Sequence, residues 1–244
     1  MDAWTYEPAA DLEQPLIERL RNFPREPDMF VYGMRSATAL AIRGWLRLYH
    51  GLTIVGSENL PADSSFVLVA NHASHLDALC LLSALPLSKL HRAFPAAAQD
   101  YFFVSVPRVL LAAVVVNALP FNRRCNPRQS ISLCRHLLEN PGNILVIFPE
   151  GTRSTDGEIG DFKAGIGLFL AGTEIPVVPC YLHGADKGWP KGAWFPKPHP
   201  VQLTIGQPRN FSHLASGKES ALAIARDLRK AVIGLRDANS RGAS

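Results

Sequence analysis

The chain has 244 residues, of which 47% are hydrophobic and 19% charged, and it is long enough to bury a large core in one domain, with or without an extension. Its formal net charge of +4 is uneven, because residues 1–30 hold three Arg and seven Asp or Glu (−4), which leaves +8 on residues 31–244. The basic part favours an anionic partner, but the sequence has no zinc-finger spacing, RNP-like motif or dense Lys/Arg run, so we expect no nucleic acid.

We interpret residues 1–30 as an acidic N-terminal extension and residues 31–244 as a single domain. Alternating strand and helix patterns predict an α/β fold with a substantially parallel central sheet flanked by helices. The predicted strands are 52–56, 66–70, 143–148, 175–184 and 201–206. The predicted helices are 34–49, about 74–84, 127–139, 162–172 and 221–235.

Two segments leave alternatives open. The helix at 34–49 carries Arg35, Arg43 and Arg47, and it fits either packing on the domain or lying on a membrane surface. The apolar run at 109–116 has eight residues, against about 20 for a spanning helix. We interpret it as a buried strand, with a wall for an acyl chain as the alternative.

The four cysteines form no C-x-x-C pair, and no secretory signal pattern opens the sequence. We therefore expect reduced thiols in a cytosolic protein. The cysteines are Cys80, Cys125, Cys134 and Cys180.

The stretch VANHASHLDAL, residues 69–79, places two histidines, a serine and an aspartate behind the apolar strand at 66–70. Ligands of open α/β sheets collect at the carboxyl ends of strands, which favours an active site. The alternative is a helix start, with Ser74 as the N-cap and Asp77 in the first turn. The stretch alone leaves both open, and we expect that Asp77 does not serve both purposes.

A second polar block, IFPEGTRS at residues 147–154, also follows a predicted strand. Gly151 permits a tight turn, and Arg153 offers donors that match a phosphate or a carboxylate. A structural ion pair between Arg153 and Glu150 is the alternative. In LPFNRRCN, residues 119–126, surface solvation would also explain Arg123 and its neighbour.

The order of the blocks is more informative than any single block. NHASHLD, PFNRR, FPEGTRS followed by FKAGIG, and VVPCYLHG resemble, in sequence and spacing, the four blocks of the glycerolipid acyltransferase family. This family includes the PlsC-like 1-acyl-glycerol-3-phosphate acyltransferases, also called lysophosphatidic acid acyltransferases. The similarity covers about residues 50–210, the motif core of an acyltransferase domain.

The resemblance implies that His72 is the catalytic base and that Asp77 pairs with it. It also implies that further residues bind the substrate, including the phosphate of the acceptor. These are Arg123, Glu150, Gly151, Thr152 and Arg153. Asn122 stands where many members have aspartate. Lys163 would face a phosphate, Pro179 would be architectural, and His75 occupies a variable position and would be packed or exposed.

These roles describe transfer of an acyl group from acyl-CoA or acyl carrier protein to a lysophospholipid hydroxyl, with 1-acyl-glycerol-3-phosphate as the favoured acceptor and phosphatidic acid as the product. An imidazole titrates near neutral pH and can take the hydroxyl proton as the bond forms, while an aspartate fixes its tautomer. We expect no metal and no cofactor besides the acyl co-substrate. The alternative acceptors are glycerol-3-phosphate, another lysophospholipid or a lyso-ornithine lipid, and a catalytically silent lipid-binding protein is a further alternative.

A lysolipid acceptor requires access to a membrane, and we expect peripheral contact with an anionic membrane at its cytoplasmic, inner face. Helix 34–49 and the loop at 187–200 are the candidate segments, because the loop interleaves Trp189, Trp194 and Phe195 with lysines. The alternative is a loop folded over the domain with its tryptophans buried.

Overall fold

The computed structural model describes residues 29–98, 117, 119–121 and 127–242. The predictions for the N-terminal extension up to residue 28, for the apolar run at 109–116, and for Arg123 and Cys125 lie outside these residues.

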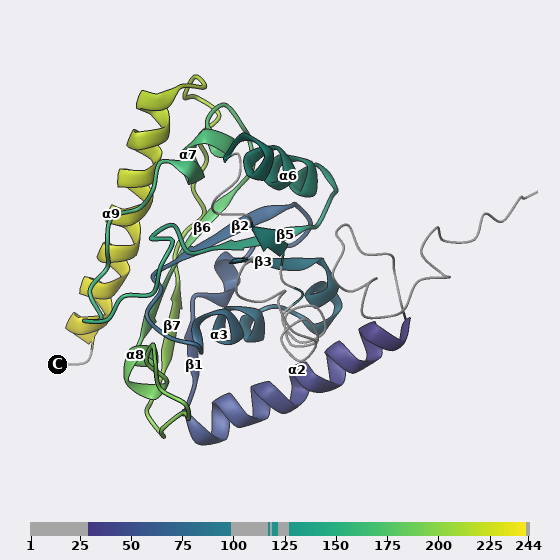
Figure 1. Ribbon diagram of the computed structural model, residues 1–244, viewed down its shortest axis with the longest axis vertical. Coiled ribbons are helices and arrows are strands. Elements are labelled where there is room, and N and C mark those ends of the chain that lie inside the picture. The colour runs from purple at the N-terminus through teal and green to yellow at the C-terminus, as the bar shows by residue number, and fades with distance from the viewer. Residues whose placement is uncertain (1–28, 99–116, 118, 122–126, 243–244) are drawn as a thin grey trace, which may run out of the picture.

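The strands form one seven-stranded sheet in the order β1-β7-β6-β2-β5-β3-β4 (Figure 1). Neighbouring strands are parallel except for β6 and β7, so the predicted substantially parallel sheet is confirmed. The strands are β1 (Thr53–Val55), β2 (Phe66–Ala70), β3 (Ala93–Ala98), β4 (Leu119–Phe121), β5 (Ile144–Ile147), β6 (Val177–His183) and β7 (Gln202–Ile205).

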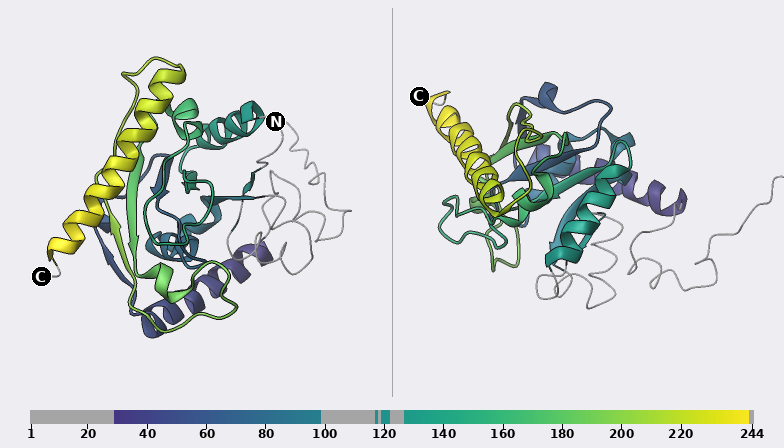
Figure 2. Two further views of the ribbon diagram at one scale, coloured as in Figure 1. Left: turned by 60° about the vertical axis from the view of Figure 1, so that its left-hand side comes forward. Right: turned by 90° about the horizontal axis from the view of Figure 1, so that it is seen from above.

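Helices cover both faces of the sheet (Figure 2). One face carries α2 (Met29–Tyr49), α3 (Asp77–Ala84) and the 3-10 helix η2 (Leu87–Arg92). The other face carries α6 (Pro127–Glu139), α7 (Gly165–Leu170) and α9 (Lys218–Gly242). The short helices η1 (Ser57–Asn59) and α8 (Ala185–Gly188) lie in connections.

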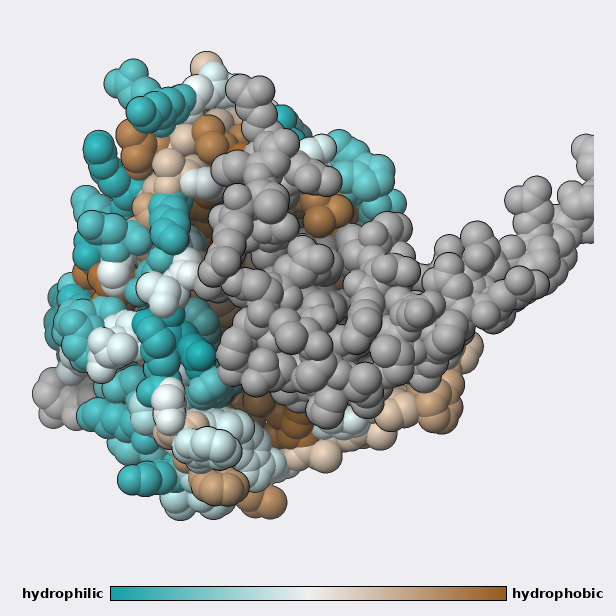
Figure 3. Space-filling model, viewed as in Figure 1, coloured by the Kyte–Doolittle hydropathy of each residue, from teal (hydrophilic) through white to brown (hydrophobic). Residues whose placement is uncertain are grey.

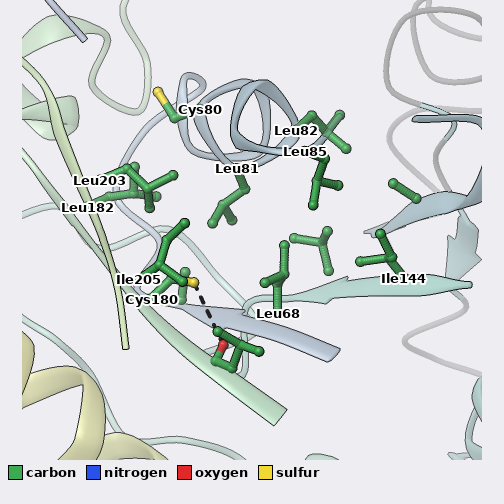
Figure 4. Close-up of a cluster of buried hydrophobic side chains, with 14 of the residues drawn as sticks. Leu68, Cys80, Leu81, Leu82, Leu85, Ile144, Cys180, Leu182, Leu203 and Ile205 are labelled. Atoms are coloured by element: carbon green, nitrogen blue, oxygen red, sulfur yellow. Dashed lines mark hydrogen bonds between the residues drawn. The ribbon is translucent and has the colours of Figure 1, made fainter. Parts of the chain in front are cut away.

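β2 lies at the centre of the molecule, and all five of its residues are buried. Phe66, Leu68 and Ala70 face the core under α3, whereas Val67 and Val69 face the core under α7 and α9. Covering both faces explains why this strand is a continuous apolar run rather than an alternating one. Figure 4 shows leucines of α3 pointing at side chains of the sheet.

β3 was not predicted. Its sequence AFPAAA is rich in alanine and contains a proline, both of which are rare in strands. The strand forms because its backbone pairs in parallel with β5 on one side and β4 on the other. Tertiary pairing therefore overrides local propensity here.

α2 packs on the domain, as one of the two alternatives predicted, but it begins at Met29 rather than at residue 34. It buries Val31, Arg35 and Leu46. Large apolar side chains on the rest of its surface remain exposed, and Figure 3 shows apolar surface along this edge of the molecule. They are Met29, Phe30, Met34, Leu40 and Leu48. No helix in the described ranges combines the length and apolar character needed to cross a bilayer.

Candidate active site

The turn after β2 is pinned by a buried amide. Asn71 donates a hydrogen bond through Nδ2 to the Leu182 carbonyl at 3.0 Å and accepts one from the Leu182 N–H at 2.9 Å. Asn71 directly follows β2, and its side chain hydrogen-bonds to both the N–H and the carbonyl of Leu182 in β6. This fixes where the chain leaves the sheet, and hence where the next residue, His72, lies.

Asp77 organises the rest of the turn. Its Oδ2 accepts hydrogen bonds from His72 Nδ1, from the Ala73 N–H and from the Ser74 N–H, each at 2.8 Å. The aspartate is 1% exposed. Because Oδ2 of the carboxylate accepts, Nδ1 of His72 carries the proton and Nε2 carries the lone pair. The pairing leaves His72 in the tautomer that a general base requires.

The helix-cap alternative is only partly correct. Ser74 is not the N-cap of α3, which is Leu76. The Ser74 hydroxyl instead accepts from the Leu76 N–H at 3.0 Å and donates to the Trp189 carbonyl at 2.8 Å. Asp77 lies in the first turn of α3 and also pairs with His72, so the expectation that it would not serve both purposes was wrong.

The imidazole of His72 packs against an aromatic ring in addition to its hydrogen bond with Asp77. It stacks on the ring of Phe148, with centroids 4.1 Å apart and planes 17° from parallel. The His72 side chain keeps 22% of its surface exposed. Packing and the Asp77 hydrogen bond thus restrict the ring while leaving it accessible to a substrate.

Glu150 is buried and binds backbone rather than Arg153. Its Oε1 accepts the His72 N–H at 2.8 Å, and its Oε2 accepts the Gly160 N–H at 3.1 Å. Burial raises the pKa of Glu150, and these two hydrogen bonds oppose that shift. The sequence-based alternative of an ion pair between Glu150 and Arg153 is therefore wrong. The Glu150 carboxylate instead holds the backbone of His72.

The residues after Glu150 turn beside a lysine. Gly151 has φ of +73°, and a Cβ built there would lie 2.5 Å from Lys163 Nζ. The positive φ favours glycine, because other L residues adopt this conformation only with strain. Lys163 therefore crosses the turn, and Thr152 beside it is exposed.

Arg153 lies against His75. Its Nη1 is 2.8 Å from Nδ1 and 2.5 Å from Nε2 of that imidazole. No carboxylate pairs with Arg153 among the residues that the structure describes. Burial, followed by the charge of Arg153, lowers the pKa of His75, so its ring is neutral at neutral pH. A half-buried guanidinium that pairs with no carboxylate of the described residues is a suitable site for an anionic ligand.

The structure brings most of the predicted site residues together. They are His72, Asp77, Glu150, Gly151, Thr152 and Arg153, whereas Arg123 lies outside the described residues. Pro179 is buried in β6 beside Val69 of β2, in keeping with an architectural position.

Three aromatic or imidazole rings adjoin the site without having been predicted to do so. Phe148 stacks on His72, and His75 contacts both Arg153 and Trp189. No local sequence pattern indicates these contacts, because each joins residues from different turns. Within the described ranges, no group of three or more His, Cys, Asp and Glu side chains is placed to hold a metal ion.

Comparisons with known proteins bear on the fold and the family. A family model described as Acyltransferase matches residues 51–183, more than half of the chain. The chain therefore belongs to the acyltransferase family, and the family resemblance of its sequence blocks is confirmed.

Two curated relatives show the range of similarity. A chloroplastic 1-acyl-sn-glycerol-3-phosphate acyltransferase of Brassica napus is 35% identical over 154 residues, which cover 59% of this chain and 41% of the relative. A 1-acyl-sn-glycerol-3-phosphate acyltransferase of Bacillus subtilis is 29% identical over 195 residues, which cover 77% of this chain and 90% of the relative. The chain thus spans less than half of the plant relative and most of the bacterial one.

One solved structure, the 1-acyl-sn-glycerophosphate (LPA) acyltransferase PlsC of Thermotoga maritima, superimposes with a TM-score of 0.63 at 24% identity. The match covers 86% of this chain and 80% of that one. It confirms the α/β fold.

Proposed function

We propose that this protein transfers a fatty acyl group from a thioester to the hydroxyl of 1-acyl-sn-glycerol-3-phosphate, giving phosphatidic acid. The observation that carries the proposal is the hydrogen bond from His72 Nδ1 to Asp77, 2.8 Å long, in the turn after the central strand. Family membership and the names of the relatives support the same reaction class.

In the proposed reaction, His72 Nε2 removes the proton from the acceptor hydroxyl while that oxygen attacks the thioester carbonyl carbon. The new C–O bond gives a tetrahedral intermediate. Its collapse breaks the C–S bond, and the departing thiolate takes the proton from His72. Asp77 stabilises the transient imidazolium, in the way that the aspartate of a serine-protease triad does. The acceptor's hydroxyl is the nucleophile, so the cycle requires no covalent enzyme intermediate.

Arg153 is the group that would position a phosphorylated acceptor. Its guanidinium contacts His75, which lies on the same turn as His72, and the Ser154 N–H donates to the His72 carbonyl at 2.7 Å. A bidentate guanidinium suits a phosphate, and holding that group near His72 lowers the entropic cost of reaction. Glycerol-3-phosphate and other phosphate-bearing lysolipids share this feature and are the alternative acceptors, whereas a lyso-ornithine lipid lacks it.

We further propose peripheral contact with the inner, anionic face of a membrane. The tip of the loop at 187–200 carries Trp194 and Phe195, which are 89% and 79% exposed. Exposed lysines flank these rings, and α2 adjoins the loop, since the Tyr49 hydroxyl donates to the Pro196 carbonyl at 3.3 Å. Aromatic rings suit the headgroup layer, and lysines suit anionic lipid. The alternative of buried tryptophans is thus contradicted at Trp194.

A thiol-release assay with a panel of acceptors tests the proposed reaction. Acyl-CoA and acyl carrier protein are each supplied with lysophosphatidate, glycerol-3-phosphate, a lysophospholipid with a larger headgroup, or a lyso-ornithine lipid. Preferred turnover with lysophosphatidate supports the proposal. Preferred turnover with another member of the panel contradicts the proposed acceptor and identifies that compound as the acceptor instead. Binding of lysolipid without thiol release from either donor indicates the catalytically silent alternative.

A further inference from the structure

His75 belongs to none of the roles described so far, yet it lies in the centre of the site. It is on the same turn as His72, and the guanidinium of Arg153 contacts both of its ring nitrogens. Among the described residues, the Arg153 side chain hydrogen-bonds to this imidazole and to no other group.

His75 also contacts the loop at 187–200. Its ring centroid lies 5.2 Å from that of Trp189, at an interplanar angle of 44°. Its backbone N–H donates to the Trp189 carbonyl at 3.2 Å, and that carbonyl also accepts the Ser74 hydroxyl. The imidazole thus contacts an aromatic ring and a guanidinium, and neither contact involves His72.

We propose that His75 is a positioning residue, whose neutral imidazole accepts a hydrogen bond from Arg153 and orients that guanidinium toward the phosphate of the acceptor. A neutral imidazole has one nitrogen with a lone pair, so it accepts from Arg153 through one nitrogen at a time. A protonated ring would have no acceptor and would repel the guanidinium. The lowered pKa of His75 favours the accepting form. This inference rests on the proposed function, because it assumes that Arg153 binds the acceptor.

Two substitutions separate the hydrogen bond from the packing. His75→Phe keeps a ring against Trp189 but removes the acceptor. His75→Gln loses the ring but supplies an amide oxygen that can accept from Arg153. The measurement is KM and kcat for lysophosphatidate, with monoacylglycerol as the phosphate-free acceptor. The matched control is His136→Phe, because the side chain of His136 is 79% exposed on α6.

We expect His75→Phe to raise the KM for lysophosphatidate about tenfold, as for the loss of one hydrogen bond to a charged group, with kcat within about twofold. His75→Gln should stay within about threefold of the wild-type KM. Monoacylglycerol kinetics and the His136→Phe control should be unchanged. In an Arg153→Ala background, His75→Phe should add no further increase, because its effect passes through Arg153.

An unchanged KM in His75→Phe, or an equal increase with and without Arg153, overturns the inference while leaving the proposed function intact. An equal increase in His75→Phe and His75→Gln also overturns it, since an amide oxygen that can accept then fails to replace the imidazole. An increase in His75→Gln alone shows that the ring acts through packing. If Arg153→Ala itself leaves the lysophosphatidate KM unchanged, the acceptor assignment fails, and the role of His75 fails with it. Thermal unfolding of each variant shows whether it is folded.

Discussion

Glu150 accepts the backbone N–H of His72 at 2.8 Å, so a buried carboxylate of the third sequence block fixes the residue proposed as the base in the first. Its other oxygen accepts the Gly160 N–H at 3.1 Å. Both oxygens are therefore occupied by backbone donors, and the segment after β5 is tied to the turn after β2. The position of the imidazole depends on this link as well as on Asp77.

Glu150→Gln should destabilise the fold and slow the reaction. Glutamine has one acceptor oxygen, and its amide nitrogen would face a backbone N–H, which leaves a buried donor unpaired. We expect a loss of about 1–3 kcal/mol in the free energy of unfolding, together with a lower kcat. Denaturant melts and thiol release measure these effects. Glu139→Gln is the control, since the side chain of Glu139 is 72% exposed, and equal behaviour of the two variants would contradict the supporting role.

Arg153→Ala should weaken phosphorylated acceptors by roughly 2–3 kcal/mol, as for loss of a charged hydrogen bond. Arg153→Lys should recover only part of this, because an ammonium lacks the planar fork of a guanidinium. The measurement compares lysophosphatidate with monoacylglycerol. The exposed Arg226 on α9 provides the control Arg226→Ala. Equal losses for the two acceptors would show that Arg153 is structural.

Membrane contact should depend on the loop at 187–200. Trp194→Ala removes an exposed ring, and Lys191→Glu reverses an exposed charge, so both should reduce binding to anionic vesicles. Binding should also fall as salt is raised, because a charge near the surface contributes about 1 kcal/mol and is screened. Co-sedimentation measures the effect, with the exposed Lys230 of α9 changed to Glu as the control. Binding unaffected by both loop substitutions would exclude the loop.

Acid should destabilise the fold partly through His50. This residue is 1% exposed, its Nδ1 lies 3.3 Å from the His199 carbonyl, and the rings of Trp45 and Tyr49 pack against it. Burial lowers the pKa of His50, the hydrogen bond to the His199 carbonyl opposes that shift, and the charge of His199 adds a smaller lowering. Because the folded-state pKa lies below the unfolded value near 6.5, only the unfolded chain binds this proton as the pH falls below about 6.5. Stability is thus fully present above that pH and declines below it.

Denaturant melts of wild type and His50→Phe at pH 7.5, 6.5 and 5.5 measure this effect. The wild type should lose more stability than the variant between pH 6.5 and 5.5, by up to about 1.4 kcal/mol per pH unit. The variant cannot take up the proton in either state. His136→Phe, at an exposed site, should follow the wild type. Parallel curves for wild type and His50→Phe would contradict the buried neutral imidazole.

The pairing of His72 with Asp77 was predicted from the resemblance to the acyltransferase family, because the stretch alone also allowed a helix start. The contacts of Glu150 and Arg153 were not predictable in the same way. Arg153 and His75 are 78 positions apart, and only the parallel pairing of β2 with β5 brings their turns together. The sequence blocks indicated which residues gather at the site, whereas their partners depend on tertiary packing.

Two tryptophans show the same limit. Trp189 and Trp194 lie in one loop of uniform composition, so residue types alone left both exposure and burial open. Trp189 is half-buried, its carbonyl accepts the Ser74 hydroxyl and its ring packs beside His75, while Trp194, further along the loop, is 89% exposed. These tertiary contacts are not encoded by residue type.

Thiol release with lysophosphatidate by His72→Ala and Asp77→Asn tests the central proposal most directly. His72→Ala should abolish turnover, and Asp77→Asn should lower kcat strongly with little change in lipid binding, because Asn cannot stabilise the imidazolium. Circular dichroism and thermal unfolding confirm that both variants are folded. Turnover of His72→Ala within about tenfold of wild type, equivalent to roughly 1.4 kcal/mol of barrier, would contradict the assignment of His72 as the general base.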